Sequence, residues 1–389
     1  MIRREELRHL ANLDFPSGCA LSFYFQPQVP QDKSHREEAI LVKDLVREAL
    51  RKAERQGNHL ALKEDLHRIS GIAEQLHGNH SRGKAIFACS EAGVWHELDV
   101  PPRLGRSMLT VNSRFHLKPL VAANSGGPRT CIALVNREKA RLFEFHEDEI
   151  RPLPDLSFGE LPHIGRSDGF GGYDGGHRER HLENEVMHHF KQFADSLHVL
   201  LNRQRFEALL VGCHDDAWPE LEQHLHSYVR QRLLGRFLVD PLAATAEQVR
   251  EQAGRILADS TLSQQEGLIR EVLGEAQRNA RGAVGLRHVL TALERQEVQT
   301  LVVSRDFAAE AVECANCRHL DTRMVRNCAL CGQETRELSD VSDALVDLAL
   351  RNGAEIMFLD GESDLGKSGG IGALLRYRAD QNTAQKVAV

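Results

Sequence analysis

Four cysteines in the last part of the chain have the spacing of metal ligands. They are Cys314, Cys317, Cys328 and Cys331, in the pattern C-x2-C-x10-C-x2-C. Two such pairs can place four thiolates around one tetrahedral ion, as in zinc ribbons with Zn–S bonds near ~2.3 Å. Because sulfur would fill every position, the pattern predicts a structural Zn²⁺ and not a catalytic one. Two alternatives stay open, namely two buried cysteine pairs and a site that has lost its metal.

A glycine-rich stretch is the second candidate for chemistry. "SDGFGGYDGG", residues 167–176, holds five glycines and runs into a basic sequence with Arg178 and Arg180. It could cradle a phosphate at a helix N-terminus, although it lacks the G-K-[ST] of a Walker loop. It could instead enter an RNA crevice, with Arg166, Arg178 and Arg180 contacting phosphates. A plain surface loop before an amphipathic helix is the third interpretation.

Residues typical of nucleophilic catalysis do not assemble in the sequence. There is no G-x-S-x-G elbow and no H-E-x-x-H motif. His188 and His189 lie in a polar helical pattern, where solvated roles are commoner than metal ligation. The remaining cysteines stand at or beside apolar runs, so we expect small buried hydrophobes at Cys19, Cys89, Cys131 and Cys213.

Length and composition indicate a globular protein of more than one domain. The 389 residues exceed what one core usually supports, and the hydrophobic and charged fractions of 41% and 27% are ordinary. A net charge of −7 argues against a uniformly basic nucleic-acid coat but leaves local basic patches possible. No apolar run approaches the roughly 20 residues of a membrane span, and the N-terminus lacks a signal-peptide core. We therefore expect a cytoplasmic protein with no membrane partner.

The order of the expected elements alternates strands with helices. Residues 1–125 should hold a buried strand at 19–26, a helix from Ser34, helices within 60–78, and strands at 84–90, 93–100 and 107–112. Residues 126–243 should hold a hairpin at 131–145, a long helix after the glycine-rich loop, a strand at 206–213 and a helix at 218–234. These patterns predict an α/β (α+β) fold.

The third expected domain covers residues 244–389. It should contain helical stretches at 246–259 and 264–280, a helix and strand within 285–304, the four-cysteine insert at 312–334, a helix at 341–353 and a strand at 354–360. Gly353 is expected to cap its helix. Gly369 and Gly370 then form either a tight turn before a last edge strand, with arginines on one face, or a structural turn alone.

The final run, "GGIGALLRYRAD" (369–380), resembles the end of the third domain of archaeal and eukaryotic class-one release factors and their relative Pelota. Other segments follow in the same order. Residues 253–304 resemble the helices and strand of that family's ribosomal-protein-like third domain, and the cysteines fall where archaeal members carry a zinc-binding minidomain. The hairpin at 131–145, the glycine-rich loop and the strand at 206–213 match the layout of the middle domain. The chain thus resembles bacterial members of this family.

The resemblance implies specific roles for the loop. It stands where release factors carry the Gly-Gly-Gln tip, with Gly171 and Gly172 in place of the glycines but Tyr173 in place of the glutamine. We therefore expect no catalytic residue and no hydrolysis. The expected ribosome-binding residues are Arg166, Gly171, Gly172, Tyr173, Gly175, Gly176, Arg178 and Arg180. The first domain has no Asn-Ile-Lys-Ser loop, and only Phe115 keeps the Tyr-x-Cys-x-x-x-Phe pattern, so stop-codon reading is not expected.

The family implies a monomeric factor that binds ribosomal RNA in the ribosomal A site and acts in hibernation or rescue. A translational GTPase such as elongation factor Tu would be a partner, and zinc a structural cofactor. Two rival functions stay open. One is a release or rescue factor that hydrolyses peptidyl-tRNA with a variant tip, and the other is a protein-binding module that works away from the ribosome.

Overall fold

The computed structural model describes residues 4–15, 18–26, 36–56, 59–75, 83–100, 107–124, 127–137, 139–146, 148–153, 175–203 and 205–377. The chain forms two compact units. One comprises residues 1–125 and 265–389, and the other residues 126–264. Both contain helices and strands, which confirms the predicted α/β class. The division into three domains stays a prediction. We call the described residues within 4–124 the N-terminal segment and those within 265–377 the C-terminal segment.

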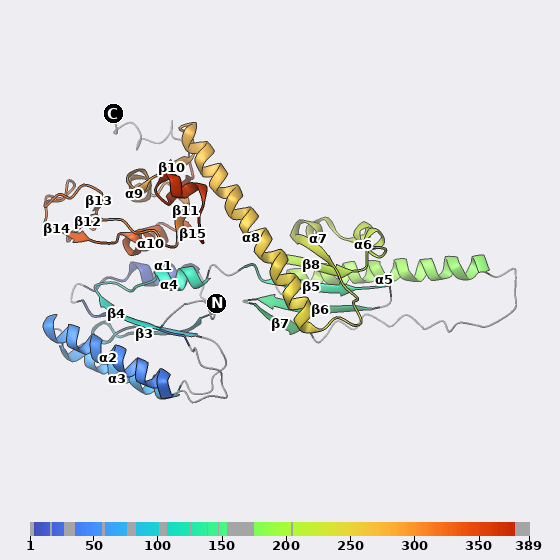
Figure 1. Cartoon of the computed structure of the whole chain (residues 1–389), viewed down its shortest axis with the longest axis horizontal. Coiled ribbons are helices and arrows are strands. Elements are labelled where there is room, and N and C mark those ends of the chain that lie inside the picture. The colour runs from blue at the N-terminus through green and yellow to red at the C-terminus, as the bar shows by residue number, and fades with distance from the viewer. Residues whose placement is uncertain are drawn as a thin grey trace. The chain divides into compact units, whose positions relative to one another are not determined.

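The N-terminal segment is an antiparallel sheet covered on both faces. Its strands, in the order β3-β2-β1-β4, are β1 (Ala20–Phe25), β2 (Gly83–Cys89), β3 (Val94–Val100) and β4 (Met108–Asn112). Side chains alternate across a strand, so Leu21 and Phe23 pack on helices α2 (Arg36–Gln56) and α3 (His59–Gln75). Figure 1 shows these two helices along one face of the sheet. Tyr24 faces the opposite side, toward α1 (Arg4–Asn12) and α4 (Lys118–Asn124).

Two cysteines of this sheet form a bond that the sequence did not reveal. Cys19 and Cys89 are buried as expected, but they form a disulfide with their Cα atoms 5.6 Å apart. The antiparallel pairing of β1 and β2 brings the start of one strand beside the end of the other. Cys131 and Cys213 are free and buried, which confirms their expected role. Burial raises the pKa of Cys131 to about 12.

The C-terminal segment has a mixed sheet in the order β10-β16-β11-β15. Its strands are β10 (Gly282–Val284), β11 (Val298–Ser304), β15 (Glu355–Leu359) and β16 (Ile371–Leu375). Ile269 and Val272 of helix α8 (Ala246–Gln277) pack on one face, and α9 (Leu286–Glu294) and α10 (Ser342–Arg351) on the other. Because β16 pairs with both β10 and β11, it is an interior strand, and the predicted edge position is wrong.

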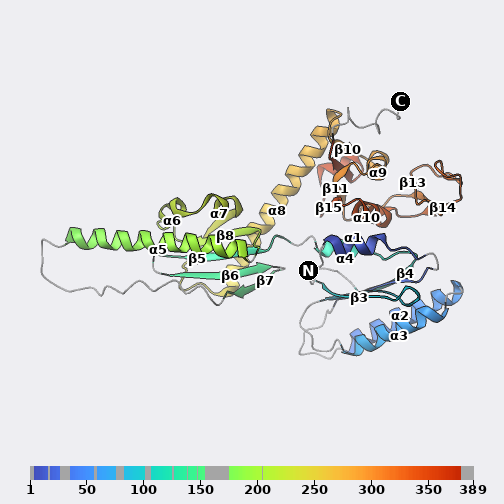
Figure 2. The same cartoon turned by 180° about the vertical axis from the view of Figure 1, so that it is seen from behind.

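One hydrophobic core joins the two segments. Leu7 and Leu10 of α1 share a buried cluster with Leu345 and Val346 of α10. Helix α1 runs beside α10 in both views (Figures 1 and 2). Gly353 ends α10 with a φ of 65°, and its N–H donates to the carbonyl of Leu350 at 3.0 Å, which confirms the predicted cap.

The middle unit is a mixed sheet in the order β7-β6-β5-β8-β9. Its elements are β5 (Thr130–Val135), β6 (Ala140–His146), β7 (Glu149–Pro152), α5 (Gly175–Arg203), β8 (Ala208–Cys213), α6 (Trp218–His224), α7 (Ser227–Arg232) and β9 (Leu233–Leu238). Strands β5 and β6 form the predicted hairpin, and β8 is the predicted buried strand. Phe190 and Phe193 of α5 are buried against this sheet, whereas Val249 and Ala253 of α8 cover its other face.

Three helical predictions need correction. The expected helix at 218–234 is divided, because Leu225 is extended (ψ 128°) and residues from Leu233 pair with β8. The two stretches at 246–280 form the single helix α8, in which the Thr261 hydroxyl donates to the Leu257 carbonyl at 2.8 Å. His189 is buried, not solvated, and burial lowers its pKa. Within the described residues, no helix is both long and apolar enough to cross a membrane.

Gly282 is required where β10 passes α8. A Cβ at this position would lie 2.3 Å from the backbone of Val272 and of Ala276. Because backbone atoms cannot give way cheaply, Gly282→Ala should destabilise the first unit by about 1–3 kcal/mol in urea unfolding. Gly274→Ala is the matched control, since its Cβ would meet nothing and alanine favours the helix. Equal stability of the two variants would contradict this packing.

Candidate functional site

The structure brings the four predicted cysteines together. Cys314 ends a strand of a small sheet, and the other three lie in the turns beside it. The sheet has the order β13-β12-β14 and is made of β12 (Ala311–Cys314), β13 (Leu320–Asp321) and β14 (Thr335–Leu338). We call residues 311–338 the ribbon. The four Sγ atoms all lie within 4.8 Å of one another, with Cys314 to Cys331 at 3.4 Å and Cys317 to Cys328 at 3.5 Å. Tetrahedral bonds of about 2.3 Å would separate sulfurs by about 3.8 Å, so the four cysteines can hold a metal ion.

The two cysteine pairs sit on turns of the same conformation. Arg318 N–H donates to the Cys314 carbonyl at 3.1 Å, and Gly332 N–H donates to the Cys328 carbonyl at 2.9 Å. In each turn the N–H two residues after the first cysteine points at its Sγ, at 3.4 Å. Arg318 and Gly332, which follow the second cysteines, have φ values of 64° and 75°. The backbone of each turn thus places its two sulfurs where they can share one ion.

The thiols differ in acidity. The N–H of Cys317 lowers the pKa of Cys314, and the N–H of Gln333 lowers that of Cys331 to about 6. The pKa of Cys317 rises to about 12 although the N–H of His319 opposes the change, because burial and the three neighbouring thiols disfavour another negative charge. Cysteines bind metal ions as thiolates, so metal binding at these four residues would release protons.

We expect one Zn²⁺ per chain, held by the four cysteines. Cys331→Ser should lower zinc affinity at least 10-fold, because a hydroxyl is a far poorer ligand than a thiolate. Metal content after dialysis and competition with a chromophoric chelator would measure this. Cys213→Ser, which removes a buried thiol from the middle unit, should bind zinc as the natural chain does. Equal affinity of the two variants would exclude the ribbon as the zinc site.

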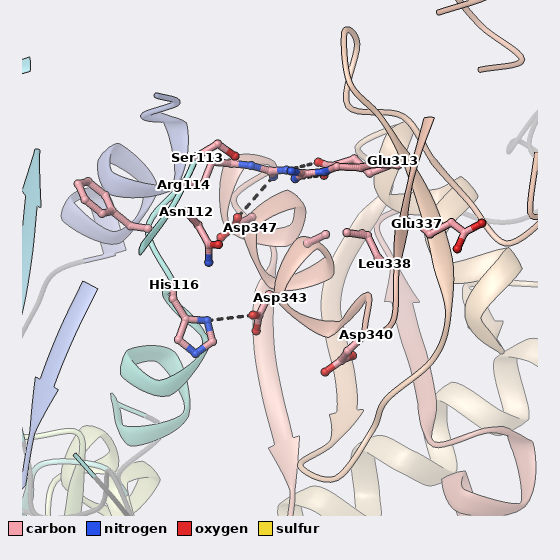
Figure 3. Close-up of a pocket in the computed structure, with 13 residues that line it drawn as sticks. Asn112, Ser113, Arg114, His116, Glu313, Glu337, Leu338, Asp340, Asp343 and Asp347 are labelled. Carbon is pink, nitrogen blue, oxygen red and sulfur yellow. Dashed lines mark hydrogen bonds and ion pairs between the residues drawn. The ribbon is translucent and has the colours of Figure 1, made fainter. Parts of the chain in front are cut away.

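A pocket of about 280 Å³ lies beside the ribbon, between residues 112–116 and α10 (Figure 3). Glu313, which is 1% exposed, stands at its edge. Arg114 Nη2 of the N-terminal segment donates to this carboxylate, and Arg336 Nε of β14 donates at 2.8 Å. A buried carboxylate costs several kcal/mol unless it is paired and hydrogen-bonded. The two guanidinium groups therefore compensate the burial of Glu313.

Further polar contacts join residues 114–118 to α10. Arg114 Nη1 lies 3.5 Å from Asp347 Oδ2, and His116 Nδ1 lies 2.9 Å from Asp343 Oδ2, as Figure 3 shows. Lys118 Nζ donates to the Ser342 hydroxyl at 2.7 Å. Burial raises the pKa of Asp347 to about 7, although Arg114 acts in the opposite direction. The arrangement holds the two segments together.

Asp347 should make the stability of the first unit fall as pH rises. A carboxyl whose pKa is higher in the folded than in the unfolded chain stabilises below its unfolded pKa, and this contribution is lost as pH rises through about 7. As pH rises from 5 to 8, the free energy of unfolding of the Asp347→Asn variant should therefore decrease less than that of the natural chain. Urea unfolding followed by Trp95, in a Trp218→Phe background, would report on this unit. Identical pH dependences would contradict the raised pKa.

The predicted loop residues are placed only in part. Arg166, Gly171, Gly172 and Tyr173 lie outside the described residues. Gly175, Gly176, Arg178 and Arg180 belong to the first turns of α5, where the backbone is described but the side chains are not. The predicted RNA-binding role of these residues stays a prediction.

One family model matches the middle of the chain. Residues 116–258 match the model of the bacterial archaeo-eukaryotic release factor family 10. The archaeal translation termination factor aRF1 is 18% identical, with 97% of this chain and 99% of that chain covered and a TM-score of 0.24. No curated protein matches the chain significantly. The resemblance predicted from the sequence is thereby confirmed.

Two further solved structures are similar to the chain. One is the archaeal Pelota in a model of ribosome-bound Pelota and ABCE1, which is 18% identical. The match covers 78% of this chain and 79% of that chain, with a TM-score of 0.42. The S. cerevisiae Dom34, described as a termination-like factor that interacts with Hbs1, is 11% identical. It covers 76% of this chain and 80% of that chain, with a TM-score of 0.40.

Proposed function

We propose that this chain, a release-factor-like and Pelota-like protein of the bacterial group matched over residues 116–258, binds the ribosomal A site and acts in hibernation or rescue. The family match carries the proposal, because the matched residues include the glycine-rich loop and all of α5. Loop and helix would contact ribosomal RNA through Arg166, Arg178 and Arg180. Stop codons would not be read, since the first segment lacks the family's decoding loop.

The remaining assignments follow from the same proposal. Zinc would be a structural cofactor of the ribbon, since its four cysteines can occupy every coordination position. A translational GTPase such as elongation factor Tu would deliver or accompany the factor. The protein would act as a monomer in the cytoplasm. Because Tyr173 stands in place of the glutamine that positions water in release factors, the bound factor would not hydrolyse peptidyl-tRNA.

Co-sedimentation of the full chain with vacant and peptidyl-tRNA-bearing ribosomes tests the proposal. Binding to vacant ribosomes should weaken steeply with salt, because each phosphate contact releases counterions. The double variant Arg178→Glu, Arg180→Glu should bind at least 10-fold more weakly. Arg255→Glu is a single charge-reversal control, since Arg255 lies exposed on α8 in the same unit and pairs locally with Glu251. Its binding should be unchanged.

Peptide release, scored in the same samples, separates the rival functions. We expect no release above background. Release that disappears in Gly171→Ala, Gly172→Ala would establish the hydrolase with a variant tip. Absence of binding to every ribosomal state would instead favour a protein-binding module that works away from the ribosome.

A further inference from the structure

Arg318 occupies a backbone position that favours glycine. Its φ of 64° lies in the left-handed region, and the equivalent residue of the second turn is Gly332. A non-glycine residue is strained in this region, so its side chain is expected to make contacts that offset the strain. Arg318 Nη2 donates to both carboxylate oxygens of Asp14, at 2.8 and 2.7 Å. Asp14 follows α1 in the N-terminal segment. Arg318 of the first cysteine turn thus contacts the N-terminal segment through Asp14.

Glu313 provides a second link between the same partners. It directly precedes Cys314 on β12, and successive side chains of a strand point to opposite faces. Cys314 therefore supplies a sulfur to the four-cysteine site, and the adjacent Glu313 supplies the buried carboxylate that binds Arg114. Any change in the path of β12 at Cys314 must also move Glu313.

The other side of the turn is fixed to the C-terminal core. His319 Nδ1 contacts Glu294 Oε1 at the end of α9, and Leu320 N–H donates to the same oxygen at 3.2 Å. The turn is therefore attached to α9 on one side and to Asp14 and Arg114 on the other. Cys317 and Cys331 are exposed, and so are the apolar side chains of Met324 and Leu330, so an apolar core covers the cysteine site only in part. A metal ion would supply the cross-link that an apolar core does not.

We propose that metal binding by the four cysteines is energetically coupled to docking of the N-terminal segment on the C-terminal segment. The ion holds the first turn in the conformation that presents Arg318 and Glu313, and these two side chains hold Asp14 and Arg114. Coupling of this kind is reciprocal, so the docked N-terminal segment must also raise the affinity for the ion. This inference does not rest on the proposed ribosomal function.

The test measures Zn²⁺ affinity in full-length variants whose changes lie far from the cysteines in sequence. Competition with a chromophoric chelator should show about 10-fold weaker binding for Asp14→Ala and for Arg114→Ala. Asp14→Asn keeps the shape of the side chain and should weaken binding in the same direction. Arg4→Ala is the matched control, because it breaks an exposed pair with Glu355 between the same two segments but away from the ribbon. Its affinity should equal that of the natural chain.

A double-mutant cycle assigns the effect to one contact. In an Arg318→Gly background, which removes both the strain and the partner of Asp14, Asp14→Ala should change zinc affinity less than 2-fold. Unchanged affinity in Asp14→Asn, Asp14→Ala and Arg114→Ala would overturn the coupling. An equal loss in Arg4→Ala would overturn it as well, because the effect would then be general destabilisation. Failure of the natural chain to bind Zn²⁺ would refute both the coupling and the metal centre.

Discussion

The buried carboxylate of Glu313 constrains the whole first unit. It is 1% exposed, and it receives Arg114 from the N-terminal segment and Arg336 from β14. Removing one cation would leave the buried charge only partly compensated, which is costly in a site shielded from water. These contacts fix the positions of β12, β14 and residues 112–116 relative to one another. Cys314 directly follows Glu313 on β12, so its position is fixed by the same contacts. The position of Cys314, one of the four cysteines that could hold a metal ion, thus depends on the docking of the N-terminal segment.

Hydrophobic burial and charge pairing make different contributions to the docking of the N-terminal segment on the C-terminal segment. The cluster that includes Leu7, Leu10 and Leu345 supplies a non-directional driving force for packing α1 against α10. This burial alone does not fix the position of α1 along α10. The contacts of Arg114, His116 and Arg318 with carboxylates are directional, so they favour one arrangement of the two segments. Burial, opposed by Arg114, raises the pKa of Asp347 at this junction to about 7.

Sequence patterns predicted the elements whose signal is local. The strand at 206–213 is an uninterrupted apolar run, the cysteine spacing is a short-range motif, and the cap at Gly353 needs only its own helix. Features that depend on distant partners were missed or wrong. β16 reads as an edge strand until β10 and β11 flank it, and the disulfide joins cysteines 70 residues apart. Arg114 and Glu313 look like solvated charges in sequence, because nothing local shows that they meet.

Hydrogen exchange of the full chain, with zinc bound and after chelation, tests the link between the metal centre and the first segment most directly. Chelation should speed exchange in α1 and at residues 112–117, as well as at the Cys314 amide that bonds the His319 carbonyl. Strands β1 and β2 should stay protected, because α2 and α3 give them a core of their own. If the ribbon loses protection while α1 and residues 112–117 exchange as before, metal binding and docking are independent and the account is wrong.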